Sequence, residues 1–275
     1  MKKYYLIGLS AIIIACGKGK NESHQNSSIS SEKVTKIDSN TIDLVRLKAN
    51  GVFKDTQQIE VKNDPVYHKN KKYNAVSLPK VFEQNPAIKK LNPLETKVVF
   101  ECEDGYKPEM SLEKLLKVKS FLAISDLDAP KESDWEQIIK DGHKMKTAPF
   151  YVVYTNIDTQ DGDYKWPYNL VKIHFLPLNQ DKEKLFPKDK TVEIGYNLFK
   201  KHCQTCHSIN QIGGTMGPEL NIPKSVTEYW KEDYLIAFIQ NPASFRKGIK
   251  MPTLGIKANE AKEIVNYLKY MASKK

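Results

Sequence analysis

Two cysteines and a histidine fall within five consecutive positions, and this spacing restricts the chain more than any other feature of its sequence. The residues are Cys203-Gln204-Thr205-Cys206-His207. A structural zinc site would need a second Cys/His pair at a suitable spacing, and none follows. A thioredoxin-like redox pair would need a βαβ setting, which the surrounding pattern lacks. The motif therefore predicts covalent attachment of haem, with both thiols as thioethers and the adjacent imidazole as an iron ligand.

Apolar residues recur at helical intervals on both sides of this motif. The spacing predicts helices over residues 191–201, 228–240 and 258–271. Asn241-Pro242 should end the middle helix, because proline disfavours helical geometry in the residue before it. We therefore expect residues 191–275 to form an all-α domain.

Residues 191–275 resemble a class I cytochrome c, a small all-α fold that holds one haem c. In that family the helix before the haem motif, here with Gly195 and Phe199, crosses the last helix, here around Tyr267 and Leu268. The resemblance implies that the same two helices cross in this chain.

Residues 213–220 include a Gly-Pro-x-Leu segment like that of the same family. The resemblance implies that the carbonyl of Pro218 accepts the second ring N–H of His207. Such a bond fixes the tautomer of the imidazole and raises its strength as a donor to iron.

The sixth iron ligand has three methionine candidates. Met251, which is followed by proline in a loop between the last two helices, matches the family segment that carries this ligand. Met216 lies close to His207 among glycines and is the alternative, beside another ligand or an open site. Met271 is expected in the core of the last helix, and His202 is expected at the surface.

An iron with two strong ligands leaves no position for a substrate, so this domain is predicted to transfer electrons. A thioether opposite an imidazole favours ferrous iron and raises the potential relative to two histidines. Residues 191–275 contain twelve Lys and Arg against seven Asp and Glu, which favours an acidic redox partner. The whole chain has a formal net charge of +10, but no compact basic cluster interleaved with aromatics indicates nucleic acid.

The N-terminal residues have the pattern of an export signal. Met1-Lys2-Lys3 is basic, and residues 4–15 form an apolar run shorter than a membrane-spanning helix. The run ends at Ala15-Cys16 and resembles the lipobox of bacterial lipoproteins, which are cut before an acylated cysteine. We expect residues 1–15 to be a lipoprotein signal peptide and Cys16 to be lipidated, and an ordinary signal peptide or an uncleaved anchor is the alternative. A lipid anchor would place the protein in the bacterial cell envelope, facing the periplasm or the exterior.

Two polar segments divide the rest of the chain. Residues 16–43 are rich in Lys, Ser and Asn and almost free of large apolar side chains through residue 40, which predicts a flexible tether. Residues 179–190 are dominated by Asp, Lys and Pro and are predicted to link two domains. Between them, residues 44–178 form the first domain.

Short β-like runs separated by Pro, Gly and Asn indicate an α+β, mainly β, fold for residues 44–178. Strands are expected around residues 58–61, 98–100, 150–154 and 171–175. Short helices are expected at residues 112–116 and 135–139. His68, His143 and His174 have no ligand spacing and are expected to be structural.

A lone cysteine, Cys102, follows an expected strand and precedes an acidic, glycine-containing turn. Residues 73–178 resemble, loosely, the sulfite-oxidase-type molybdopterin-binding fold, in which such a thiolate ligates molybdenum. The alternative is that Cys102 is a small buried hydrophobic residue. Residues 73–178 contain no arginine to hold a pterin phosphate, so we expect no molybdopterin.

Two functions follow from these patterns. The first is a membrane-tethered monohaem electron carrier that serves an extracytoplasmic redox protein or a membrane electron-transfer complex, with a non-catalytic first domain. The alternative is a small molybdenum oxidoreductase in which Cys102 holds the metal and the haem drains electrons away. Iron and molybdenum analysis of protein from its native host separates the two.

Overall fold

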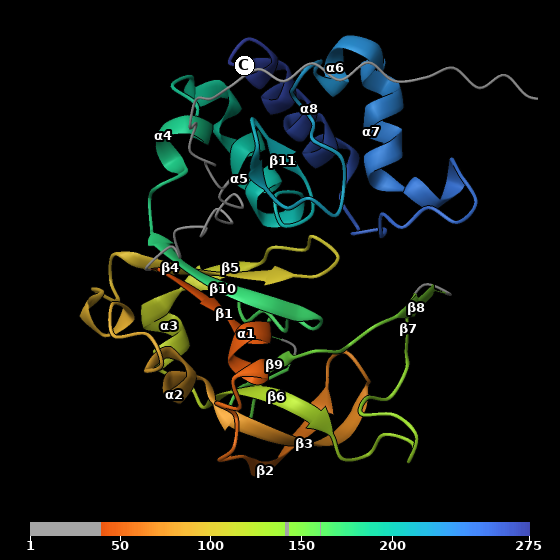
Figure 1. The fold of residues 1–275 in the computed structure, drawn as a ribbon. Coiled ribbons are helices and arrows are strands. Elements are labelled where there is room, and N and C mark those ends of the chain that lie inside the picture. Colours follow the sequence, from red (N-terminus) through yellow and green to blue (C-terminus); the bar gives the residue numbers. More distant parts are fainter. Residues whose placement is uncertain (1–39, 141–142, 160) are drawn as a thin grey trace, which may run out of the picture. The chain divides into compact units, whose positions relative to one another are not determined.

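The computed structural model describes residues 40–140, 143–159 and 161–275, and Asp38–Lys275 form one compact unit. The predicted signal peptide, Cys16 and residues 16–39 of the predicted tether lie outside the described residues. In the described chain, β-strands dominate up to about residue 177 and helices dominate after it (Figure 1). This order agrees with the prediction of a mainly β region followed by an all-α region.

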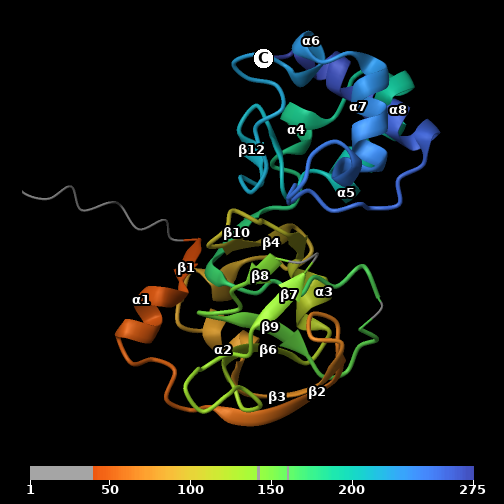
Figure 2. The same cartoon turned by 90° about the vertical axis from the view of Figure 1, so that its right-hand side faces the viewer.

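Two four-stranded antiparallel sheets form most of the β-rich part (Figures 1 and 2). The strand order is β1-β10-β4-β5 in the first sheet and β2-β3-β6-β9 in the second. The strands are β1 (Thr41–Asp43), β2 (Gln57–Asp64), β3 (Lys69–Ser77), β4 (Thr96–Cys102), β5 (Glu109–Ser111), β6 (Ser120–Asp126), β9 (Tyr151–Tyr154) and β10 (Leu170–Pro177). Short helices accompany them, namely α1 (Leu44–Ala49), α2 (Leu78–Phe82), η1 (Ile88–Lys90) and α3 (Leu112–Leu116).

Side chains on the central strands alternate between the core and the opposite face, as expected for half-buried strands. On β4, Val98 and Phe100 are fully buried, whereas Val99 between them is partly exposed. Ile173 of β10 and Leu122 of β6 join them in one core, so this core contains residues of both sheets. The strands predicted at residues 58–61, 98–100 and 171–175 lie within β2, β4 and β10. The strand predicted at residues 150–154 begins one residue before β9 and ends with it.

Two predictions for the β-rich part differ from the structure. Thr41–Asp43, assigned to the tether, form β1 and pair with β10, because Ile42 is buried in the sheet core. Residues 135–139, predicted as a helix, instead lead into β7 (Ile138–Lys140), which pairs with β8 (His143–Met145). Ile138 is 4% exposed and Ile139 is 70% exposed, which is the two-residue alternation of a strand. The predicted helix at residues 112–116 is confirmed as α3.

The helical part contains a core shared by α5 and α8 and several shorter elements. Its elements are α4 (Lys182–Leu185), η2 (Lys190–Val192), α5 (Glu193–His202), β11 (Ser208–Ile209), β12 (Ile212–Gly213), α6 (Val226–Tyr229), α7 (Glu232–Gln240), η3 (Pro242–Ser244) and α8 (Ala258–Ala272). The predicted end of the middle helix at Asn241-Pro242 and the predicted last helix are both confirmed.

Two boundaries in the helical part also differ from the prediction. The predicted helix at residues 228–240 is two helices, because Trp230 between α6 and α7 has extended backbone (φ −114°, ψ 139°). The predicted linker at residues 179–190 contains α4, whose Leu185 is 1% exposed and belongs to the core of the helical part. The carbonyl of Leu185 accepts the hydroxyl of the buried Tyr267 at 2.8 Å.

Gly195 sets the distance between α5 and α8. A Cβ atom added at Gly195 would lie 2.1 Å from the carbonyl oxygen of Glu263 and 2.8 Å from Cβ of Tyr267. Phe199, one turn further along α5, packs against the ring of Tyr267 with centroids 5.6 Å apart. The crossing of these helices at Gly195, Phe199 and Tyr267 is confirmed, and only a residue without a side chain fits at its closest point.

This close approach predicts that Gly195→Ala destabilises the protein. Alanine favours a helix over glycine by roughly 1 kcal/mol, but the added methyl group must push the helices apart, which typically costs about 1–3 kcal/mol or more. We expect a net decrease in the free energy of unfolding, measured by guanidinium denaturation. Ile194→Ala, at a position that is 62% exposed on the same helix, is the control and should change it by less than about 0.5 kcal/mol. A Gly195→Ala protein more stable than the parent would contradict this packing.

Candidate haem site

The cysteine-histidine motif lies where α5 ends and the chain begins a tight turn. The N–H groups of Cys206 and His207 both donate to the carbonyl of Cys203, at 3.0 and 2.9 Å. Neither Cys203 nor Cys206 forms a disulfide. Burial, with a smaller effect of Cys206, raises the pKa of the Cys203 thiol to about 12. A reactive redox dithiol requires the opposite shift, so this environment favours a structural or attachment role over thiol chemistry.

His207 is held by a single well-defined contact. Its Nδ1 lies 2.8 Å from the carbonyl oxygen of Pro218, which confirms the contact expected from the resemblance. Because a carbonyl can only accept, Nδ1 must carry the proton and Nε2 is left as the metal-binding nitrogen. Burial lowers the pKa of His207, and the Pro218 contact raises it by a smaller amount. The net shift is downward, and it favours the neutral imidazole that ligates iron.

Glycines let the segment after the motif fold closely over it. A Cβ at Gly217 would lie 2.4 Å from Cε1 of His207, and a Cβ at Gly214 would lie 2.0 Å from the carbonyl oxygen of Thr205. The N–H of Gly214 donates to Gln204 and the N–H of Gly217 donates to Cys206, both at 2.8 Å. The imidazole is thus clamped against the backbone of residue 217, where no larger residue fits.

Glu219 is a site residue that sequence reasoning missed. Its carboxylate accepts the N–H groups of Asn210, Gln211 and Asn221 at 2.9–3.0 Å. Burial raises its pKa, but these and a serine hydrogen bond outweigh that effect, so the pKa of Glu219 is lowered. It closes the loop that carries Pro218. Its position between proline and leucine was the available signal, but the sequence could not reveal its four backbone donors, the fourth being the N–H of Ile222 at 3.3 Å.

The three methionines lie in different environments. Met271 is 1% exposed and in the core, as expected, whereas Met216 is 40% exposed. Met251 lies partly buried in the segment between α7 and α8, and its role as an iron ligand stays a prediction. His202 is partly exposed, and burial and then Lys201 lower its pKa.

Four aromatic rings form a cluster that the helical pattern did not reveal. Trp230, Tyr234, Phe238 and Phe245 have neighbouring ring centroids 4.4–6.4 Å apart. Tyr234 is 42% exposed and Phe245 is 37% exposed. Two of the four rings are thus exposed at the surface.

Cys203 and Cys206, neither of which forms a disulfide, and the oriented imidazole of His207 fit a covalently attached haem.

Cys102 lies at the end of β4 and is only 3% exposed, within the core of the two sheets. Burial, followed by the nearby Asp104 and Glu101, raises the pKa of its thiol, which disfavours the thiolate that a metal would need. In the parts of the chain that the structure describes, no three His, Cys, Asp or Glu side chains are grouped to hold a metal ion. This burial fits the interpretation of Cys102 as a small buried hydrophobic residue, and a molybdenum ligand at Cys102 stays the alternative.

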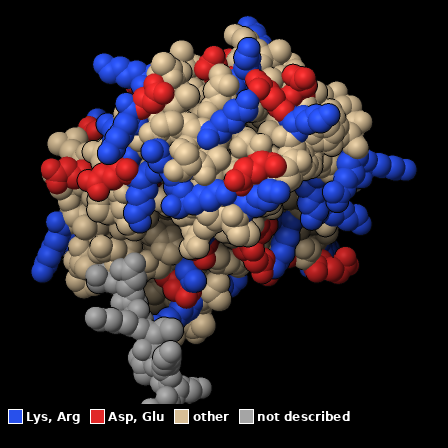
Figure 3. Space-filling view, turned by 90° about the horizontal axis from the view of Figure 1, so that it is seen from above, with Lys and Arg blue, Asp and Glu red and all other residues tan. Residues whose placement is uncertain are grey.

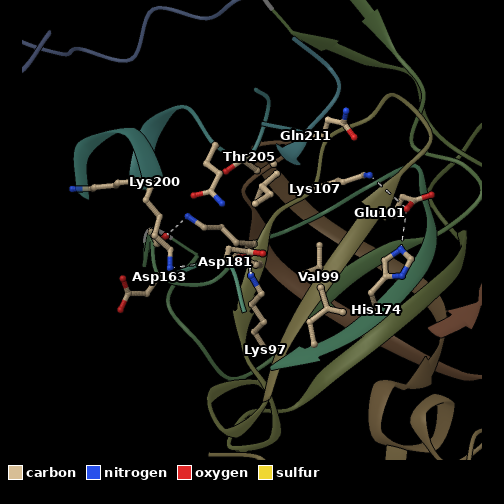
Figure 4. A pocket seen from close by; sticks show the side chains of 18 of the residues that line it. Lys97, Val99, Glu101, Lys107, Asp163, His174, Asp181, Lys200, Thr205 and Gln211 are labelled. Carbon is tan, nitrogen blue, oxygen red and sulfur yellow. Dashed lines mark hydrogen bonds and ion pairs between the residues drawn. The ribbon is translucent and has the colours of Figure 1, made fainter. Parts of the chain in front are cut away.

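A pocket of about 730 Å³ lies beside the motif (Figure 4). It is lined by residues of β4, β5, β10 and α5 and by Gln204 and Thr205 of the motif. Lys97, Lys107 and Lys200 line it, and each pairs with a carboxylate that also lines the pocket. His174 also lines it and has a structural role, because its two ring nitrogens contact Thr41 and Glu101, each at 2.9 Å.

No helix in the described residues has the length and apolar character needed to cross a membrane.

Comparison with known proteins matches the helical part. The family model described as "Cytochrome C oxidase, cbb3-type, subunit III" matches residues 190–268. A cytochrome c of Gibberella zeae is 31% identical over 97 residues, which is 28% of this chain and 92% of that protein. Cytochromes c of Theileria annulata and Arabidopsis thaliana are each 30% identical and cover 29% and 27% of this chain, and 85% and 83% of their own lengths. The helical C-terminal part, in which the motif, the oriented imidazole and the crossed helices occur together, thus places this chain in the cytochrome c family.

Proposed function

We propose that this protein is a membrane-tethered monohaem c-type cytochrome that transfers single electrons to or from an extracytoplasmic redox partner. The observation that carries the proposal is the bond from Nδ1 of His207 to the carbonyl of Pro218 at 2.8 Å, in the same turn as Cys203 and Cys206. That bond commits Nε2 to iron. The β-rich part serves as a non-catalytic docking region.

When bound, haem supplies an iron that changes its charge by one electron. Cys203 and Cys206 would hold it through thioethers, His207 would ligate the iron through Nε2, and Met251 would supply the second axial ligand. Two strong ligands exclude a substrate from the iron, which supports electron transfer over catalysis. The glycine clamp on His207 supports the same conclusion, since a fixed ligand lowers the rearrangement that accompanies each change of charge.

Surface charge supports an acidic partner. Lysines and arginines are spread over the face of the molecule in Figure 3, with fewer acidic residues among them. The excess of basic residues in residues 191–275 would speed encounter with a negatively charged protein, and this effect should weaken as salt is added.

The attachment of haem is tested by removing both thiols. Cys203→Ala combined with Cys206→Ala should leave no haem on the protein after acid-acetone extraction, because thioethers survive this treatment and coordinate bonds do not. Cys102→Ala, which removes the cysteine in the sheet core, is the control and should retain the haem. Covalent haem on the double variant would overturn the proposed function.

The axial ligand is tested by exchanging methionines. Met251→Ala should abolish the weak near-infrared sulfur-to-iron absorption of the oxidised protein. It should also lower the reduction potential, because the thioether that favours ferrous iron is lost. Met216→Ala, at a position that is 40% exposed, should change neither property. The reverse result would assign the sulfur ligand to Met216.

The lipid anchor is tested at Cys16. Labelling of cells with a fatty-acid analogue should tag the parent chain and Cys102→Ala, whereas Cys16→Ser should carry no label and leave the membrane fraction. Each buried methylene of an acyl chain contributes roughly 0.8 kcal/mol of membrane affinity, so loss of acylation should be visible on fractionation. Unchanged labelling of Cys16→Ser would refute the lipoprotein proposal.

A further inference from the structure

We propose that the turn between β4 and β5, residues 102–107, docks on the haem-attachment loop (residues 203–207) and on the glycine-rich segment after it, and restricts access to the haem beside Cys206. We call these residues the docking turn. The inference rests on the proposed function in one respect, namely that haem is attached at Cys203 and Cys206. The docking itself is independent of that assignment.

Two backbone hydrogen bonds join the docking turn to the attachment loop. The N–H of Lys107 donates to the carbonyl of Thr205 at 3.0 Å, within the motif itself. The N–H of Thr215, in the glycine-rich segment that clamps His207, donates to the carbonyl of Gly105 at 2.9 Å. The docking turn therefore bonds both to the attachment loop and to the glycine-rich segment that follows it.

Gly105 makes this close approach possible. Its φ is +87°, a conformation that residues with side chains rarely adopt. A Cβ at this position would lie 2.6 Å from Oγ1 of Thr215 and 2.8 Å from the backbone nitrogen of Met216. Both the backbone angle and the available space require glycine, so the contact is built into the sequence at one position.

Tyr106 anchors the docking turn to the sheets. Its side chain is partly buried and packs against the core of the two sheets. The docking turn is thereby held on the sheets while its backbone bonds to the attachment loop.

A separate set of ion pairs, away from the docking turn, also joins the first sheet to the helical part. Lys97 of β4, whose side chain is 4% exposed, pairs with Asp181 immediately before α4 and with Glu109 of β5 (Figure 4). Lys200 of α5 pairs with Glu109 at 3.5 Å. The Lys97 pair is shielded from salt by burial, whereas Lys200 is 47% exposed and contributes little. These pairs line the pocket between the sheet and the motif, which explains why that pocket is rich in charge yet electrically balanced.

The decisive variant is Gly105→Ala in the haem-loaded full chain. Its matched control is Gly162→Ala, because a Cβ at Gly162 meets nothing within 4 Å. Hydrogen exchange of the Thr215 and Lys107 amides should be about tenfold faster in Gly105→Ala, given the usual cost of a left-handed residue with a side chain. The amides of Gly214 and Gly217, which donate to the carbonyls of Gln204 and Cys206, should exchange as in the parent.

Access to the haem is measured in the same proteins by the rate of reduction with ascorbate. We expect a several-fold faster rate in Gly105→Ala at an unchanged reduction potential and an unchanged rate in Gly162→Ala. Asp181→Asn weakens the ion pair with Lys97 without changing the docking turn, and it should increase both the rate of amide exchange and the rate of haem reduction. It is the second variant for the case in which Gly105→Ala does not fold.

Equal amide exchange in Gly105→Ala and Gly162→Ala would overturn the docking. Faster exchange with an unchanged reduction rate would overturn the restriction of access. Failure of the proposed function has a different signature, namely absence of covalent haem from the parent chain, and the exchange readout remains valid in that case.

Discussion

The site depends on the backbone hydrogen bonds that join residues 213–217 to the attachment loop. These bonds form only because glycines at 214 and 217 let one stretch of main chain lie against another and against the ring of His207. Pro218 follows directly, and its carbonyl is thereby delivered to Nδ1 of His207. The imidazole is oriented by main-chain atoms, which cannot change rotamer. The arrangement is therefore rigid without any large side chain.

The β-rich part is stabilised differently, by alternating apolar side chains from two sheets and by a few buried charges. Lys71 and Asp126 are both fully buried and pair at 2.6 Å, and Glu136 pairs with the same ammonium group at 2.8 Å. Breaking such a pair by removing one partner typically costs about 3–5 kcal/mol, because a charge is left in the core. This part of the chain thus has its own strongly specified interior, which suits a region that presents a turn for docking.

Much of the helical part could be predicted because its signals are local. The Cys203–His207 motif, the Gly-Pro-x-Leu segment and the apolar stripe of the last helix lie within short stretches of sequence. The prediction failed where a short run of apolar residues fits both the spacing of a helix and the alternation of a strand. Trp135, Ile138 and Ile139 have helical spacing, yet the last two alternate as in a strand. The docking of residues 102–107 on the attachment loop could not be predicted, since its hydrogen bonds join main-chain atoms of residues about a hundred positions apart. The sequence feature that relates to it is Gly105.

The hydroxyl of Tyr267 has a consequence for how the chain can be divided. Its acceptor is the carbonyl of Leu185, which precedes the stretch that matches the cytochrome family model at residues 190–268. A fragment that began at residue 190 would keep Cys203, Cys206, His207 and Met251. It would leave the buried hydroxyl of Tyr267 without its acceptor and would expose the core that Leu185 fills. An unmet hydrogen bond of this kind costs about 1–3 kcal/mol. A stable fragment of the helical part therefore has to begin before α4. The boundary of the helical part thus lies within residues 179–190, whose composition predicted a linker.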